Sequence, residues 1–235
     1  PQDVGASNPS CLSGEGGGIH SAGSGVTLEG VSFERNRCET GALDAGCSGG
    51  AISMTGQGPS SVASIAGAVQ GSAGSAATGG ASFDGCLFEG NEARGAATNS
   101  VYSGAGQGGA VAIRFAFPTF TACNFTGNSA EGGGGAAPAT GGAVLLFLSR
   151  GTASADQAET PTFINCVFEA NRAGPIVLEG GSTGNENAPK TRRGEQGHGI
   201  GGAVAAIASS PLLVGCSFTN NTAVARFPSS GAGEE

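Results

Sequence analysis

The stretch Gly141-Gly142-Ala143-Val144, with Cys166-Val167-Phe168-Glu169-Ala170-Asn171 further along, decides the fold, because both halves recur five times in this chain. The first half is a glycine pair followed by a small residue and then Ile or Val. The pairs are Gly16-Gly17, Gly49-Gly50, Gly108-Gly109, Gly141-Gly142 and Gly201-Gly202. The second half reads Phe-x-x-Asn, at Phe33/Asn36, Phe88/Asn91, Phe125/Asn128, Phe168/Asn171 and Phe218/Asn221.

The spacing between the two halves is constant except for insertions. From the second glycine to the Phe there are 16 residues in repeats one, three and five, 38 in the second and 26 in the fourth. A constant frame with variable insertions is typical of a solenoid, whose core positions are fixed while its loops vary in length.

Further positions recur in phase with this motif. Five residues before each Phe stand Leu28, Phe83, Phe120, Phe163 and Leu213, and two before it stand Val31, Cys86, Cys123, Cys166 and Cys216. The Cys-x-Phe step has a period of two, which is strand periodicity and points Cys and Phe to one face. The sequence therefore predicts an all-β fold, a parallel β-helix built as a single-stranded solenoid of about five coils with loop insertions.

Composition excludes several classes of protein. Glycine accounts for 46 of 235 residues but lacks the every-third spacing of collagen. Charged residues make up only 12%, too few for a charge-rich disordered chain. The net charge of −8 argues against nucleic acid or an anionic membrane as the partner. No apolar run approaches the roughly 20 residues that span a bilayer.

The repeat pattern predicts one domain over residues 16–225. An irregular lead-in is expected over 1–15 and a tail or linker over 226–235. The chain has no initiator Met, no signal-like start and no evident capping helix, so we expect a segment of a larger protein or assembly.

Two long inserts, 55–80 and 174–199, are predicted to be surface loops that add no strand to the core. The loose spacing of apolar residues over 62–69 leaves a short helix open in the first. The second contains Lys190, Arg192 and Arg193. These three cations indicate either a solvated loop or a contact for an acidic partner or a glycan.

The seven cysteines fall into two groups. The four in the repeated column are predicted to be buried reduced thiols, because parallel Cβ atoms do not suit a disulfide. Cys38 and Cys47 bracket a polar loop and are the favoured disulfide in a secreted protein, with Cys11–Cys47 as the alternative. There is no Cys-x-x-Cys, and we expect no metal or other cofactor.

Both halves of the motif are explained by architecture. The Phe fills the core beside a corner, and the Asn is expected at the turn, where it tolerates the left-handed region and bonds to nearby backbone. Stacked Asn side chains can also bond to one another along the axis. The glycine pair suits a corner where a Cβ would collide or where φ is positive.

Taken together, the alternating Gly-Gly-Ala-(Ile/Leu/Val) and Phe-x-x-Asn motifs resemble the repeats of the chlamydial polymorphic outer membrane protein (Pmp) family over roughly residues 16–225. The first repeat departs from that pattern, with Gly18 in the Ala position and Val31 in place of the column Cys. The resemblance implies a right-handed parallel β-helix, an extracellular or cell-surface location and an adhesive role.

The expected function is a structural or adhesive module in an extracellular or cell-surface assembly, with a protein or glycan partner and no enzymatic activity or direct membrane insertion. The alternative is a carbohydrate-binding or polysaccharide-degrading, pectin-lyase-like protein. Such enzymes need clustered carboxylates, whereas Asp3, Asp44, Asp84 and Asp156 are far apart in the repeat frame. Scattered Thr residues disfavour ice binding.

One acidic column is visible in the sequence. Glu34, Glu89 and Glu169 each follow the motif Phe directly, and Thr126 and Thr219 complete the column. This column fits an exposed polar strand better than a cation site.

Two sequons are candidate N-glycosylation sites. They are Asn124-Phe-Thr126 and Asn220-Asn-Thr222. Asn124 lies between two inward residues, so strand alternation predicts that it points outward. Asn220 precedes the corner Asn221 and is also expected to be exposed.

Overall fold

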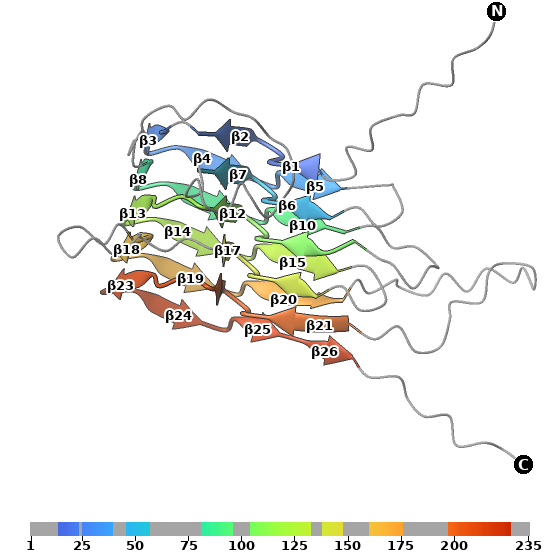
Figure 1. Ribbon diagram of the computed structural model, residues 1–235. Coiled ribbons are helices and arrows are strands. Elements are labelled where there is room, and N and C mark those ends of the chain that lie inside the picture. The colour runs from blue at the N-terminus through green and yellow to red at the C-terminus, as the bar shows by residue number, and fades with distance from the viewer. Residues whose placement is uncertain are drawn as a thin grey trace, which may run out of the picture.

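The structure of this chain, a computed structural model, describes residues 14–23, 25–39, 46–56, 81–95, 104–132, 138–147, 160–175 and 197–226. Every regular element within these ranges is a β-strand. The strands stack in five successive coils, from the blue N-terminal coil to the red C-terminal coil (Figure 1). The predicted parallel β-helix is confirmed.

Each coil contributes one strand to each of five sheets, which we name A to E in the order in which the chain meets them, and one further strand at the C-terminal end joins sheet A. Sheet A contains β1 (Gly14–Glu15), β6 (Cys47–Ser48), β11 (Gly106–Gln107), β16 (Ala139–Thr140), β21 (Gly197–Ile200) and β26 (Ala225–Arg226). Sheet B contains β2 (Ile19–Ala22), β7 (Ile52–Thr55), β12 (Val111–Arg114), β17 (Val144–Phe147) and β22 (Val204–Ile207).

The other three sheets carry the second half of each coil. Sheet C contains β3 (Thr27–Glu29), β8 (Ser82–Asp84), β13 (Thr119–Thr121), β18 (Thr162–Ile164) and β23 (Leu212–Val214). Sheet D contains β4 (Ser32–Glu34), β9 (Leu87–Glu89), β14 (Asn124–Thr126), β19 (Val167–Glu169) and β24 (Ser217–Thr219). Sheet E contains β5 (Arg37–Glu39), β10 (Glu92–Arg94), β15 (Ser129–Gly132), β20 (Arg172–Pro175) and β25 (Thr222–Ala223).

Pairing is parallel between neighbouring coils and preserves the register of the repeat. Phe125, for example, lies between Phe88 and Phe168 in sheet D. One strand breaks the rule: β26 pairs antiparallel with β21, His198 lying opposite Ala225. Residues at equivalent positions of the sequence repeat therefore lie beside one another in neighbouring coils.

The main core lies between sheets B, C and D. The two Phe columns stack nearly parallel along the axis, with ring centroids 4.7 Å apart for Phe88 and Phe125 and 4.5 Å apart for Phe83 and Phe120. Between the columns the rings meet edge to face, as Phe120 and Phe125 do at 5.7 Å. Both geometries are favourable for aromatic pairs, so the size-matched Phe columns stabilise the core along the axis.

A second, narrower core lies between sheets E and A. It is lined by small residues such as Ala130, Ala139 and Ala173, all fully buried. A Cβ at Gly106 would overlap the carbonyl oxygens of Ala93 and Glu131, so the two sheets approach too closely for larger side chains.

The glycine pair turns the chain between sheets A and B. Gly141 has a φ of 65°, in the left-handed region that favours glycine. A Cβ at Gly142 would overlap the carbonyl oxygen of Gly202 and the backbone of Arg172. Gly141 therefore meets both predicted requirements, since a Cβ there would also overlap the carbonyl oxygen of Val144, and Gly142 meets the requirement of close approach.

Several sequence-based boundaries need correction. Strand β1 lies within the predicted lead-in, and β26 extends one residue into the predicted tail. The insert predicted over 174–199 yields strand residues at both ends, in β20 and β21, because the small residues there fit the narrow E–A core. Thr55 likewise ends β7. Apart from Gly56, the rest of both inserts, including the open helix over 62–69 and the cations from Lys190 to Arg193, lies outside the described residues.

The Phe column is buried in four coils but not in the fifth. Phe33, Phe88, Phe125 and Phe168 are at most 7% exposed, whereas Phe218 is 47% exposed. The prediction that the whole column is buried is wrong at this end, because no described coil covers the outer face of the fifth coil.

Candidate functional site

The Asn residues of the motif form a continuous hydrogen-bonded ladder at the corner between sheets D and E. The Nδ2 atom of each Asn donates to the Oδ1 atom of the next at 2.9 Å. The ladder runs Asn36, Asn91, Asn128, Asn171 and Asn221. Each Oδ1 also accepts the backbone N–H of the preceding Asn at 3.0 Å. The amide stacking predicted from the sequence is therefore present along all five coils.

The ladder corrects the role expected for Asn in the turn itself. The left-handed backbone occurs one residue earlier, for example at Gly127 with a φ of 62° and at Ala170 with a φ of 53°. Asn128 and Asn171 are fully buried and point into the corner. These positions thus require Asn because its amide makes hydrogen bonds inside the corner, and not because the backbone there is left-handed.

The repeated cysteines lie at the corner between sheets C and D, as the Asn residues lie at the corner between sheets D and E. Cys86, Cys123 and Cys166 are free and buried, and Cys216 is free and partly exposed. Each thiol donates to a carbonyl of the preceding coil, as Cys123 Sγ does to Phe83 O at 3.4 Å. A hydrogen bond with the Cys166 thiol, together with burial, raises the pKa of the Cys123 thiol. These thiols belong to the core, and their hydrogen bonds to the preceding coil also stabilise the corner between sheets C and D.

The structure pairs Cys38 with Cys47, between β5 of sheet E and β6 of sheet A. The disulfide occupies the narrow core, where other coils have Ala or Gly, and it ties the first coil to the second. Cys11 lies outside the described residues, so the alternative pairing involves a residue of which nothing is described.

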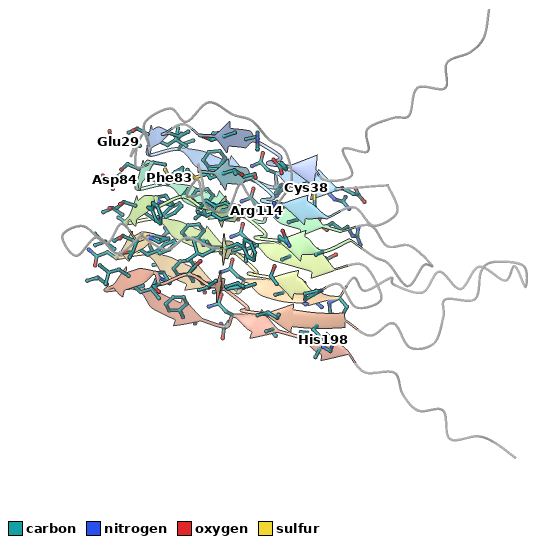
Figure 2. The ribbon with its side chains drawn as sticks, in the orientation of Figure 1. Glu29, Cys38, Phe83, Asp84, Arg114 and His198 are labelled. Carbon is teal, nitrogen blue, oxygen red and sulfur yellow. A yellow bond between two sulfur atoms is a disulfide. The ribbon has the colours of Figure 1, made fainter. Side chains whose placement is uncertain are left out.

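The outer faces of sheets C and D bear the acidic residues of the first two coils. Glu34 is in register with Glu89, and Glu29 is in register with Asp84. Figure 2 shows Glu29 and Asp84 on neighbouring coils at the same edge of the molecule. In the sequence Asp84 is far from every other Asp, but the strand register places it beside a Glu.

Glu169 does not join that group directly. Thr126 lies between Glu89 and Glu169, as the sequence predicts for this column, so these two carboxylates are not on neighbouring coils. Among the residues that the structure describes, no group of three or more His, Cys, Asp or Glu side chains is arranged to hold a metal ion.

Both candidate glycosylation sites lie on or beside sheet D with exposed side chains. Asn124 opens β14, between Leu87 and Val167 in register. Asn220 occupies the left-handed position before Asn221, with a φ of 55°. The two acceptor side chains therefore point away from the core.

Sheet E carries a network of alternating charges on its outer face that the sequence analysis missed. The network has six members, which are, in order, Glu39, Arg37, Glu92, Arg94, Glu131 and Arg172. The N···O distances between consecutive members are 3.2, 3.4, 3.8, 3.3 and 3.7 Å. Burial raises the pKa of the Glu131 carboxyl, and the charge of Glu92 adds to this rise.

A signal for this network was present in the sequence. The residues one and three places after the motif Asn are Arg37 and Glu39 in the first coil but Glu92 and Arg94 in the second. Register places opposite charges directly beside each other, which stabilises neighbouring strands. The charges thus follow the same repeat columns as the apolar residues and are predictable from them.

Comparison with family models, curated proteins and solved structures finds no match to this chain. The described part of the chain also contains no helix long and apolar enough to cross a membrane.

Proposed function

We propose that this chain is a structural or adhesive β-helix module of an extracellular or cell-surface assembly. The observation that carries the proposal is the Asn ladder, since the repeated polar residues are fully engaged in holding one coil to the next. A chain that uses its repeated polar residues in this way gains a rigid rod with a long outer surface. The resemblance to Pmp repeats supports the same role.

The outer faces of sheets C and D are the surface we assign to the partner. They combine the register pairs Glu34–Glu89 and Glu29–Asp84 with an exposed Arg35 at the corner. A protein or glycan partner bearing cations would complement the excess of acids there. The charges of sheet E, in contrast, already neutralise one another.

Localisation and binding can be tested together. Antibodies against the folded chain should label intact, unpermeabilised source cells or their extracellular material. Beads coated with the chain should bind that material, and the quadruple variant Glu29→Gln, Asp84→Asn, Glu34→Gln, Glu89→Gln should bind less. Labelling confined to permeabilised cells would contradict the proposed location, and equal binding by the variant would contradict the proposed surface.

The second candidate is a polysaccharide-binding or polysaccharide-degrading protein, and the same register-matched acids favour it. Paired carboxylates on one face are what general acid–base cleavage of a glycosidic bond requires. Incubation with acidic and neutral polysaccharides, followed by an assay of new reducing ends, distinguishes the candidates. Product formation that Asp84→Asn abolishes would establish the enzyme and overturn the purely structural role.

A further inference from the structure

The main core is open at the end formed by the fifth coil, which contributes β22, β23, β24 and β25. Leu213 and Phe218, the inward residues of sheets C and D in this coil, are 43% and 47% exposed. At the opposite end of the same Phe column, Phe33 is only 7% exposed. Three further apolar side chains of the fifth coil are exposed, namely Ile207, Leu212 and Val214. Apolar side chains that gather in this way mark an interaction surface.

The backbone at this end has unused hydrogen-bond donors. The N–H of Ala170, in the fourth coil, donates to the carbonyl of Thr219 at 2.9 Å. The equivalent N–H in the fifth coil is that of Asn220, and it has no acceptor among the described residues. The N–H of Asn221 and one hydrogen of its Nδ2, which in the rest of the ladder go to the next Asn, also lack an acceptor there. Such an edge is a template for strands of another chain.

The two ends of the stack differ in charge. No residue of β22, β23, β24 or β25 is charged or a proline, the residue types that usually protect a sheet edge from pairing. The equivalent strands of the first coil are mostly acidic, with Glu29, Glu34, Glu39 and one cation, Arg37. The whole chain has a net charge of −8. Like charges brought together across an interface are costly, so the uncharged end is the one suited to meet its own copy.

The fifth coil also accepts an antiparallel strand at its edge. Strand β26 pairs with β21 in this way, with His198 opposite Ala225. Two copies related by a two-fold axis at right angles to the stack would present their edge strands to each other in the same antiparallel sense. Sheets A and E lie to one side of the main core (Figure 1), so an axis through the main core points the two β26 strands in opposite directions.

The C-terminal residues of this chain do not supply the missing cover as a further coil. Two of the coils, counted from Gly17 to Gly50 and from Gly109 to Gly142, take 33 residues each. The stretch after Arg226 has nine residues and contains no Phe-x-x-Asn motif. A second copy of the chain is therefore the occupant that the charge and the strand direction favour.

We propose that the open end of the main core binds the same end of a second copy, which gives a dimer with two-fold symmetry. Leu213 and Phe218 of each chain cover those of the other, and the edge strands of the two fifth coils pair antiparallel. Each chain uses the same surface, so association stops at two chains. This dimer uses neither the acids of sheets C and D nor the scaffold role proposed above.

The test measures the molar mass of the chain by light scattering and by sedimentation, at chain concentrations from about 1 μM to about 100 μM. The mass should rise from that of one chain to that of two and then stay constant. Leu213→Lys should weaken association at least about tenfold, because it buries an unpaired ammonium group in the dimer. In the monomer the lysine stem can extend past the open end and keep its charge in water.

Leu28→Lys is the matched control, because Leu28 belongs to the same column in the first coil. It should leave association unchanged. An equal loss of association in Leu28→Lys, or a mass that grows beyond two chains, would mean that the first coil stacks on the fifth coil of the next copy, and would overturn the two-fold dimer. A mass of one chain at about 100 μM, or unchanged association in Leu213→Lys, would overturn the proposal outright.

Thermal unfolding of both variants at low concentration separates loss of association from loss of fold. If Leu213→Lys does not fold, hydrogen exchange of the native chain still locates the contact. Exchange in peptides that contain Asn220 and Asn221 should slow as the concentration rises, while peptides from the first coil should not change. Slower exchange confined to any other region would contradict the proposed interface.

Discussion

Asn128 donates two hydrogen bonds to a single atom of Asn171, its Oδ1: one from Nδ2 at 2.9 Å and one from the backbone N–H at 3.0 Å. The Oδ1 atom of Asn128 receives the same pair from Asn91. The second Nδ2 hydrogen of Asn128 goes to the carbonyl of Phe88 at 2.9 Å. A primary amide has two donors and two acceptor sites, so every one of them is used, in a residue with no solvent exposure.

Replacing Asn128 by Ala should therefore unfold or strongly weaken the central coils. The change removes the four hydrogen bonds of the Asn128 side chain: two that its Oδ1 accepts from Asn91 and two that its Nδ2 donates to Asn171 Oδ1 and the Phe88 carbonyl. The expected cost is about 3–6 kcal/mol in the free energy of unfolding. Denaturant titration measures it. Asn221→Ala is the control, because that residue ends the ladder and is only partly buried. A loss below about 1 kcal/mol for Asn128→Ala would show that the ladder does not stabilise the fold.

Phe125→Ala tests the aromatic columns. Phe125 is fully buried, stacks on Phe88 and Phe168 and meets Phe120 and Phe163 edge to face. Its truncation should cost about 3–5 kcal/mol, the range for a buried Phe.

Phe218→Ala provides a matched control for this variant in the same column. Phe218 has one stacking neighbour, Phe168, and is 47% exposed, so its loss should cost clearly less. Equal costs for the two variants would contradict the burial that the structure shows.

Much of this fold could be predicted from the sequence because the information repeats. Stacked coils place like residues together, so Phe88, Phe125 and Phe168 identify one column even though the intervals between the repeated motifs differ. The inward direction of Cys123 and Phe125 follows from strand alternation alone. Five copies of each weak pattern provide strong evidence together.

What could not be predicted depends on contacts between different columns. The meeting of Arg114 with Ser48 and Gln107 requires sheet A to fold back against sheet B, and no periodicity encodes that angle. The number of strands in each coil could not be predicted either, because the break between β13 and β14 depends on a single left-handed residue, Ala122. Non-glycine residues in that conformation carry no clear sequence signal.

The charge network on sheet E makes stability depend on pH through Glu131. Because burial raises the folded-state pKa of this carboxyl above its unfolded value near 4.5, folding favours the protonated form. Its contribution is fully present below the unfolded pKa and is lost as pH rises through the folded-state pKa. Glu131→Gln should therefore gain stability relative to the native chain as pH rises above the unfolded value near 4.5.

Urea titrations at several pH values measure this trend. Glu39→Gln, which removes a 53% exposed carboxylate from the other end of the same network, is the matched control. The relative gain should be larger for Glu131→Gln than for Glu39→Gln. A decline for Glu131→Gln as pH rises would mean that the guanidinium groups of Arg94 and Arg172 outweigh burial.

The thiol column should react in an order set by exposure. Cys216 is partly exposed, whereas Cys86, Cys123 and Cys166 are at most 1% exposed. Iodoacetamide must reach the sulfur atom, so it should modify Cys216 first in the native chain, even though burial raises the pKa of the Cys216 thiol. Peptide mapping before and after addition of denaturant reads the order, and early modification of Cys123 would contradict the buried column.

The last prediction concerns Asn124, whose side chain points outward from sheet D between Leu87 and Val167. A glycan attached to an Asn within a strand needs free space on that face of the folded protein. The Asn124 side chain is exposed on the outer face of sheet D, so this space is present. When the chain is secreted through a eukaryotic pathway, peptides with Asn124 and Asn220 should carry glycans that an endoglycosidase removes. Asn124→Gln and Asn220→Gln should each abolish one of them. The Asn8-Pro-Ser peptide is an internal control, because its proline prevents modification. Unmodified Asn124 and Asn220 in secreted material would contradict the prediction, and the proposed extracellular location would then rest on the repeat resemblance alone.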